Sequence, residues 1–305
     1  MMEKYISIEK QEGAAPLELL EERSIVTKEE LRERFPEKQI YACDFYVEGI
    51  ENDEIITGGF KDKDIVNIDH HAPVSEMAKV ISSTNLTIRY VKENGVVSGP
   101  TSQVVINHTD CDSVLSSSIL RGVLEADEQF GEAAIAADHT GAENRIADLL
   151  QSVSKIRDIE FSLRNLKLLL ADEKLEDLAG EMLAKRMSDR ARAAAMVEAG
   201  AFSNLGDIYF AEVREKIDGE FLPALLPEAK VILLASPMKE NPNLWEIKVR
   251  LGNSALGIQL NNLELPNFGG RWNAGSTKRS GGTPLSVREY AQLIQQKISG
   301  RSGAE

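Results

Sequence analysis

Metal-binding side chains are concentrated in the heptapeptide NHTDCDS, residues 107–113, which follows a run of apolar residues. It packs one imidazole and two carboxylates into five positions: His108, Asp110 and Asp112. A second polar group, IDHH at residues 68–71, precedes it in the chain. Mixed imidazole and carboxylate ligation suits Mn²⁺, Fe²⁺, Co²⁺ or Zn²⁺, whereas sites made only of oxygen favour Mg²⁺ or Ca²⁺. The two stretches therefore predict a site for a divalent cation.

Histidine is scarce in this chain, and every histidine lies within two positions of an aspartate. The histidines are His70, His71, His108 and His139. A single histidine near an apolar strand is best explained as a core residue with a satisfied hydrogen bond. Three of these, however, come at the ends of predicted strands, and structural histidines would not be expected to cluster there. The set favours metal binding when it is taken with five aspartates: Asp44, Asp69, Asp110, Asp112 and Asp138.

Charge gives a second reason to expect cations. Carboxylates held this close together repel one another, and burying them unpaired would cost several kcal/mol each. Divalent cations cancel that charge. The ligands are numerous enough for two ions about 3.5–4 Å apart, the arrangement that clamps the attacking and leaving oxygens in phosphoryl transfer. Water between two such ions is acidified into a nucleophile, so the residues predict hydrolysis of a phosphoester.

The candidate ligands follow apolar, β-prone runs that are typical of buried strands. We expect strands over residues 39–45, 63–71, 86–91 and 102–108, and a helix over 112–126. The segment GEAAIAADHTG, residues 131–141, fits either a short strand or a helix end. Strands that alternate with helices indicate an α/β fold with a mainly parallel sheet, in which ligands bind at the carboxyl ends of the strands.

The composition changes after residue 142. Residues 142–200 are amphipathic and almost free of glycine, which predicts several helices with breaks near Ala171–Asp172 and Ser188. A second α/β pattern follows, with strands expected over 206–213, 229–237 and 245–252, a glycine-rich cationic loop over 268–282 and a final helix over 285–298. We place a domain boundary near residue 200.

The charge and composition of the chain limit the classes of function. In 305 residues, 35 Lys plus Arg and 49 Asp plus Glu give a formal charge of 35 − 49 = −14, so the surface does not attract nucleic acid by itself. No apolar run is long enough to span a bilayer, and no secretory signal is visible. Two cysteines, Cys43 and Cys111, are too few for a disulfide framework. We expect a cytoplasmic protein in which both thiols fill small spaces beside the ligands.

Several motifs together resemble those of the DHH phosphoesterase superfamily. IDHHAP resembles the motif that names the family, and NHTDCDS resembles its His-x-Asp-x-Asp motif. Asp44 and Asp138 are similar to the lone aspartates of two further motifs. FGGRWNAGS resembles the glycine-rich substrate loop of the companion DHHA1 domain, so the resemblance covers most of residues 40–285. The chain departs from the family in two ways: the His-x-Asp-x-Asp motif follows the DHH motif, as in a permuted chain, and Arg271 and Trp272 stand where a loop histidine is expected.

The resemblance implies a role for each candidate ligand. His108 and Asp110 would hold one ion, with Asp44 as a bridge to the other. The second ion would be held by a different set: His70, Asp112 and Asp138. If the chain is permuted, Asp44 and Asp138 could exchange roles. His71 would face the substrate phosphate and Asp69 would orient a ligand, while His139 either has an unassigned role or makes a structural hydrogen bond.

Eight residues in the C-terminal part are expected to bind the substrate: Gly269, Gly270, Arg271, Trp272, Asn273, Lys278, Arg279 and Arg250. Glycines let backbone N–H groups approach an anion, the cationic side chains can pair with phosphate, and the tryptophan offers a face on which a base can stack. A surface loop without a ligand is the alternative explanation for this stretch, and a solvated strand residue is the alternative for Arg250.

The resemblance implies three parts: a DHH-type catalytic domain over 1–142, a helical connector over 143–200 and a smaller α/β DHHA1-like domain over 201–305. The expected function is a two-metal phosphohydrolase, with Mn²⁺ preferred over Mg²⁺, Co²⁺, Fe²⁺ and Zn²⁺. Its substrate would be a small nucleotide-like phosphoester such as a short oligonucleotide or a dinucleotide. Short single-stranded nucleic acid is a further candidate partner, a membrane is not, and the oligomeric state is left open. Two alternatives remain: a non-catalytic metal- or nucleotide-binding regulatory protein on the same fold, and a pyrophosphatase-like enzyme.

Overall fold

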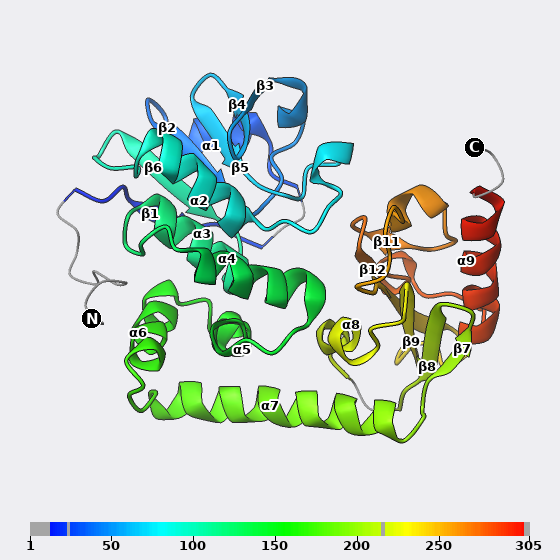
Figure 1. The fold of residues 1–305 in the computed structure, drawn as a ribbon. Coiled ribbons are helices and arrows are strands. Elements are labelled where there is room, and N and C mark those ends of the chain that lie inside the picture. The colour runs from blue at the N-terminus through cyan, green and yellow to red at the C-terminus, as the bar shows by residue number, and fades with distance from the viewer. Residues whose placement is uncertain (1–12, 23–24, 215–216, 302–305) are drawn as a thin grey trace. The chain divides into compact units, whose positions relative to one another are not determined.

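The computed structural model describes residues 13–22, 25–214 and 217–301. The chain divides into two compact units, each built around a six-stranded sheet. The first unit comprises Met1–Asp138 and Glu143–Arg186, and the second comprises His139–Ala142 and Met187–Glu305. Helices pack against both sheets (Figure 1), which confirms the α/β fold class. The division of the chain into catalytic, connector and substrate-binding parts stays a prediction.

The sheet of the first unit has the strand order β1-β6-β2-β5-β4-β3. Four neighbouring strands are parallel: β1 (Leu17–Leu19), β6 (Ser102–Ile106), β2 (Gln39–Cys43) and β5 (Ile65–Ile68). Two short antiparallel strands complete the edge: β4 (Gly59–Asp62) and β3 (Glu54–Ile56). Every residue of β5 and β6 is buried. The three runs that were expected to form strands are thus confirmed as strands. The structure also shows that they are neighbours in the sheet.

Residues 86–91 do not form the strand that we predicted, because they lie within helix α2 (Ser83–Asn94). A reciprocal N-terminal cap favours the helix here, although the β-branched residues of the stretch are typical of a strand. Ser82 Oγ accepts a hydrogen bond from Asn85 N at 3.1 Å, and Asn85 Oδ1 accepts one from Ser82 N at 3.2 Å. Such a cap satisfies N–H groups that would otherwise be unpaired at the start of the helix.

Other helices of the first unit include α1 (Lys28–Arg34), α3 (Cys111–Leu120), α4 (Glu128–Ile135), α5 (Arg145–Val153) and α6 (Ile159–Leu170). A π-helical turn, Ala136–Thr140, continues α4, so the helix-end alternative for residues 131–141 is correct. The expected break near Ala171–Asp172 is confirmed. The break near Ser188 is wrong, since α7 (Asp177–Glu198) runs through it. An ion pair between Asp189 and Arg192, three residues apart, supports the helix at that point.

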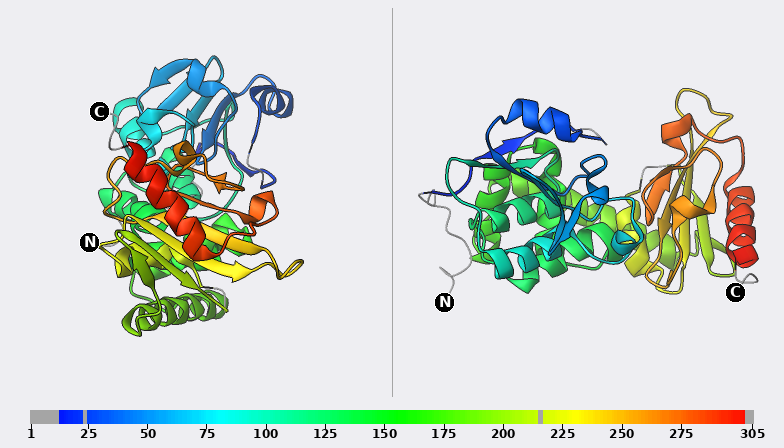
Figure 2. Two further views of the ribbon diagram at one scale, coloured as in Figure 1. Left: turned by 90° about the vertical axis from the view of Figure 1, so that its right-hand side faces the viewer. Right: turned by 90° about the horizontal axis from the view of Figure 1, so that it is seen from above.

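The sheet of the second unit has the order β11-β12-β10-β9-β8-β7. Its strands are β7 (Ser203–Leu205), β8 (Ile208–Glu212), β9 (Val231–Pro237), β10 (Trp245–Leu251), β11 (Gly269–Gly270) and β12 (Ala274–Ser276), and its helices include α8 (Leu222–Leu225) and α9 (Val287–Arg301). Helix α9 lies along this sheet (Figure 2), where Tyr290 and Ile294 are fully buried. The three strands predicted for this part are confirmed.

The glycine-rich segment 268–282 is not a loop throughout, because it contains the antiparallel pair β11–β12. A Cβ atom added at Gly270 would lie 2.3 Å from Gly275 Cα, and one added at Gly275 would lie 2.4 Å from the Phe268 ring. Glycine is therefore needed at both positions by the packing of the hairpin itself. Among the residues that the structure describes, no helix is both long and apolar enough to cross a membrane.

Candidate metal centre

The candidate ligands of the first unit emerge together at the carboxyl ends of three adjacent parallel strands. Cys43 in β2 is paired with Ile68 in β5, and Ala42 in β2 is paired with Val105 in β6. The residues that follow these strand ends therefore leave the sheet at one level, on one edge. They include Asp44 after β2, residues 69–71 after β5 and residues 107–112 after β6. This is the edge at which parallel α/β sheets bind ligands.

Asp44, His108 and Asp110 form the first group that could hold an ion. His108 Nε2 lies 3.2 Å from Asp44 Oδ2 and 3.3 Å from Asp110 Oδ2. Asp44 is fully buried, while the other two side chains are partly buried. One imidazole nitrogen and two carboxylate oxygens so placed are a suitable donor set for Mn²⁺, Fe²⁺, Co²⁺ or Zn²⁺.

His70, Asp112 and Asp138 form the second group, and all three are buried. His70 Nε2 lies 3.3 Å from Asp138 Oδ2 and 3.7 Å from Asp112 Oδ2. Asp138 reaches this group from the π-helical turn that follows α4. Such turns are rare and are found frequently at functional sites. The sequence showed an aspartate here, but it did not predict the turn.

Asp44 stands between the two groups, with one carboxylate oxygen toward each. Its Oδ2 lies 3.2 Å from His108 Nε2, and its Oδ1 lies 3.8 Å from His70 Nε2. Oδ2 also accepts a hydrogen bond from Ser113 Oγ at 2.7 Å, whereas buried Oδ1 receives none from the described residues. A carboxylate oxygen buried without a donor is costly, and a cation shared between the groups would satisfy it. The residues present therefore fit a metal site.

The backbone at Asp44 is held in the left-handed region, with φ of 59°. An aspartate tolerates this region better than most residues, but such conformations still cost energy and cluster at functional sites. Asp44 N donates to Ile68 O at 3.1 Å, which ties the turn to the end of β5. The turn carries the Asp44 side chain to the position between His70 and His108.

Neighbouring backbone and side-chain groups hold several of these candidate ligands. Asp69 accepts a hydrogen bond from the backbone N of His71 at 2.9 Å and lies 2.5 Å from His71 Nδ1. Asp112 accepts from the backbone N–H groups of Ser83 and Thr84, each at 2.7 Å, at the N-terminus of α2. Groups behind a ligand fix its direction and tune its affinity for a metal. The sequence did not single out Ser83, Thr84 or Ser113, because their roles depend on which helix reaches the strand ends.

The pKa values of these side chains also reflect the concentration of negative charge in the cluster. Burial alone would raise the pKa of Asp44, but its hydrogen bond to His108 and the charges of His108 and His71 hold that pKa well below its usual value. Burial tends to lower the pKa of His108, yet Asp110 and Asp44 raise it well above its usual value. Burial and the charge of Asp44 raise the pKa of Asp112. These shifts reflect carboxylates and imidazoles that are buried close together.

Buried Asn67 holds the strand end that carries Asp44. Its Nδ2 donates to Ala42 O at 3.1 Å and to Phe45 O at 2.9 Å, and its Oδ1 accepts from Val47 N at 3.1 Å. We expect Asn67→Ala to lower the free energy of unfolding by about 3 kcal/mol, because buried backbone groups lose their partners. Urea denaturation measures the change. Asn52→Ala, at an exposed asparagine, is the control; equal stability of the two variants would contradict this role.

The predicted substrate residues all belong to the second unit. Most of them surround the β11–β12 hairpin, and Arg250 lies opposite Ala274 on the adjacent strand β10. Trp272 packs against the core of this unit, and Lys278 Nζ lies 3.7 Å from Glu246 Oε2. Asn273 is buried and bonds to His139, which supports the hydrogen-bond alternative for that histidine. Substrate binding by this set stays a prediction.

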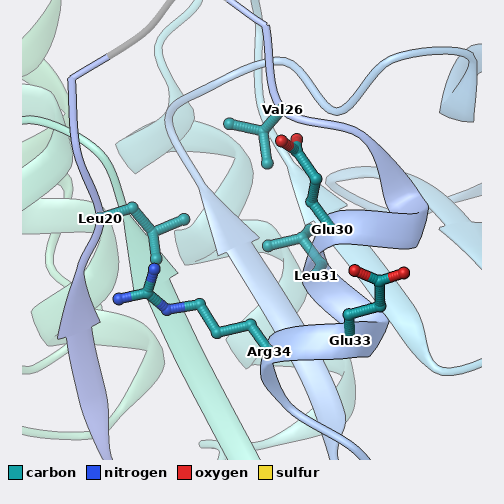
Figure 3. Close-up of a pocket in the computed structure, with 6 residues that line it drawn as sticks. All are labelled: Leu20, Val26, Glu30, Leu31, Glu33 and Arg34. Atoms are coloured by element: carbon teal, nitrogen blue, oxygen red, sulfur yellow. The ribbon is translucent and has the colours of Figure 1, made fainter.

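A separate hollow of about 310 Å³ lies on the first unit between α1 and the end of β1 (Figure 3). Its lining contains apolar and charged side chains: Leu20, Val26, Glu30, Leu31, Glu33 and Arg34. None of the candidate metal ligands lines it.

No protein-family model matches the chain, and no curated protein matches it. Among solved structures, the chain is similar to a pGpG-specific phosphodiesterase, PggH, from Vibrio cholerae, with a TM-score of 0.41, 11% identity, and coverage of 68% of this chain and 81% of that one. It also matches an uncharacterized protein from Helicobacter pylori G27, with a TM-score of 0.24, 11% identity, and coverage of 86% and 99%. Both TM-scores are low, so the function is inferred below from this chain's own residues.

Proposed function

We propose that the protein is a metal-dependent phosphoesterase that binds two divalent cations, preferably Mn²⁺, and hydrolyses a small nucleotide-like phosphoester. One observation carries the proposal: buried Asp44 belongs to two of three overlapping groups of possible metal ligands, with its Oδ2 toward His108 and its Oδ1 toward His70. Purely structural clusters of carboxylates and imidazoles have no need of such a bridge. A pair of bound cations would acidify a water molecule and neutralise charge on the phosphoryl group.

The residues of the chain would prepare the site for that chemistry. Asp44 sets the spacing of the two groups, since its carboxylate spans them. Asp69 holds His71 through Nδ1 at 2.5 Å, so the other ring nitrogen, Nε2, would contact a phosphoryl oxygen. Burial of Asp112 and His70 removes water from one side of the site, which strengthens electrostatic interactions within it.

The arrangement of the strands also supports a relationship to the DHH phosphoesterases. The chain meets β5 with IDHH before β6 with NHTDCDS, which is the reverse of the family order. In the sheet, however, both strands flank β2 and Asp44. A metal site depends on where strand ends converge and not on the order of the strands in the chain, so a permuted chain can keep the same site.

The test is a panel of phosphoesters incubated with the purified full chain in the presence of Mn²⁺, Mg²⁺ or a chelator. The panel contains linear and cyclic dinucleotides, short oligonucleotides, bisphosphorylated nucleotides and pyrophosphate. We expect hydrolysis of a nucleotide compound with Mn²⁺ and none with the chelator. Metal binding without hydrolysis of any member would favour the non-catalytic regulatory alternative, and hydrolysis of pyrophosphate alone would favour the pyrophosphatase.

Arg271 provides a test of the substrate-binding role of the second unit. We expect Arg271→Ala to raise KM about tenfold with little change in kcat, because one charge-assisted hydrogen bond to a phosphate would be lost equally from the ground state and the transition state. Steady-state kinetics on the best substrate of the panel measure both constants. The control Arg288→Ala, at an exposed arginine on α9, should leave KM and kcat unchanged. An unaltered KM for Arg271→Ala would mean that the phosphate binds elsewhere.

A further inference from the structure

The tetrapeptide His139–Ala142 connects a candidate metal ligand to the second unit. It belongs to that unit, although the residues on both sides of it belong to the first. The residue immediately before it is Asp138, whose Oδ2 lies 3.3 Å from His70 Nε2 in the second ligand group. Whatever holds the tetrapeptide therefore acts on the backbone directly beside a ligand.

The side chain of His139 is held by the β11–β12 hairpin. Asn273 Nδ2 donates to His139 Nδ1 at 3.1 Å, and both residues are only 6% exposed. An amide nitrogen can only donate, so His139 Nδ1 accepts in this bond and its proton lies on Nε2. The Trp272 ring lies beside the imidazole, with centroids 5.9 Å apart. These contacts fix the direction of the first side chain after Asp138.

The backbone of the tetrapeptide is held by three other parts of the second unit. Arg190 on α7 donates to Gly141 O at 2.8 Å, and its guanidinium lies 4.4 Å from the centre of the Phe221 ring. Asn253 donates to Thr140 O at 3.4 Å. Gly141 has φ of +65°, and a Cβ atom there would lie 2.1 Å from the carbonyl oxygen of Glu220. The segment therefore has one well-defined path through the unit.

We propose that Asn273 and Arg190 are positioning residues for Asp138 and so set the affinity of the second cation. Neither residue belongs to the ligand groups, and each acts through the clamped tetrapeptide. A ligand must be held close to its working position, and loss of a group behind a ligand lowers metal affinity by about 10- to 100-fold. The inference rests on the part of the proposed function that makes Asp138 a metal ligand.

The test measures Mn²⁺ binding to the full chain by equilibrium dialysis and electron paramagnetic resonance, without substrate. In Asn273→Ala and Arg190→Gln, we expect the second ion to bind about 10- to 100-fold more weakly. The ion held by Asp44, His108 and Asp110 should bind as in the wild type, which also reports that the first unit is folded. The matched controls, Arg192→Gln beside Arg190 on α7 and Asn262→Ala at an exposed asparagine, should bind both ions normally.

Three results would overturn the inference. In the first, both ions bind the two clamp variants with wild-type affinity. In the second, the binding of both ions is weakened together, which would mean that the clamp acts on the fold and not on Asp138. A wild-type chain that binds fewer than two ions would also overturn it. A chain that binds two ions, shows the selective loss and hydrolyses no phosphoester would instead refute the proposed function and leave the inference standing.

Discussion

Asp44→Asn is expected to lower kcat for Mn²⁺-dependent hydrolysis by on the order of a thousandfold or more, because the variant loses the anionic bridge between the two cations. Asparagine keeps the size of the side chain and tolerates the left-handed backbone at φ of 59°. The loss should therefore come from chemistry at the cluster and not from unfolding. Steady-state kinetics with saturating Mn²⁺ measure kcat, and circular dichroism reports the fold.

The matched control is Asp64→Asn, which removes one carboxylate from the same unit, where Asp64 pairs with Arg32 at 2.9 Å. It should keep its turnover within a factor of two or so, since partly exposed ion pairs contribute little. Full turnover by Asp44→Asn would show that the reaction takes place elsewhere.

Saturating Mn²⁺ is expected to raise the free energy of unfolding of the wild-type chain by about 5 kcal/mol. Each cation present at one hundred times its dissociation constant contributes about 2.7 kcal/mol, provided that it binds only the folded chain. The physical source is the like charge of five carboxylates near one strand edge, which the cations neutralise. Urea denaturation with and without Mn²⁺ measures the difference, and a chelator should abolish it.

Two variants test whether the cluster is where Mn²⁺ binds to stabilise the chain. Asp44→Asn should lose most of it, whereas Arg271→Ala, in the second unit, should keep all of it. A gain of the same size in Asp44→Asn would place the bound Mn²⁺ outside this cluster. No gain in the wild-type chain would mean that the histidines and aspartates pair among themselves and bind no cation.

The sequence predicted the strands of the cluster because each signal is local. Residues 39–43, 65–68 and 102–106 are mainly apolar and β-prone, and that pattern predicts buried strands in a parallel sheet. The histidines after them identified the strand ends as a chemical site. The order β5-β2-β6 was not predictable in this way, because pairing of distant strands depends on the whole sheet.

Local signals also misled in one stretch, and they could not show contacts between distant residues. In LTIRYV, residues 86–91, the β-branched side chains favoured a strand, but the cap at Ser82 and the packing of α2 against α3 prevailed. The roles of Asn67, Ser113 and Thr84 could not be found at all, since each side chain bonds to a residue far away in the chain. His139 lacked an assignment for the same reason, because its partner Asn273 lies 273 − 139 = 134 positions later.

That separation matters during translation. Ribosomes extend a chain by about 5–20 residues per second, so Asn273 is added roughly 7 to 27 s after His139. A nascent chain that already contains the aspartates and histidines of the cluster still lacks the hairpin that holds the residue after Asp138. The hairpin is thus synthesised well after the candidate ligands, and under the inference above a chain that stops before Asn273 would bind the second cation weakly.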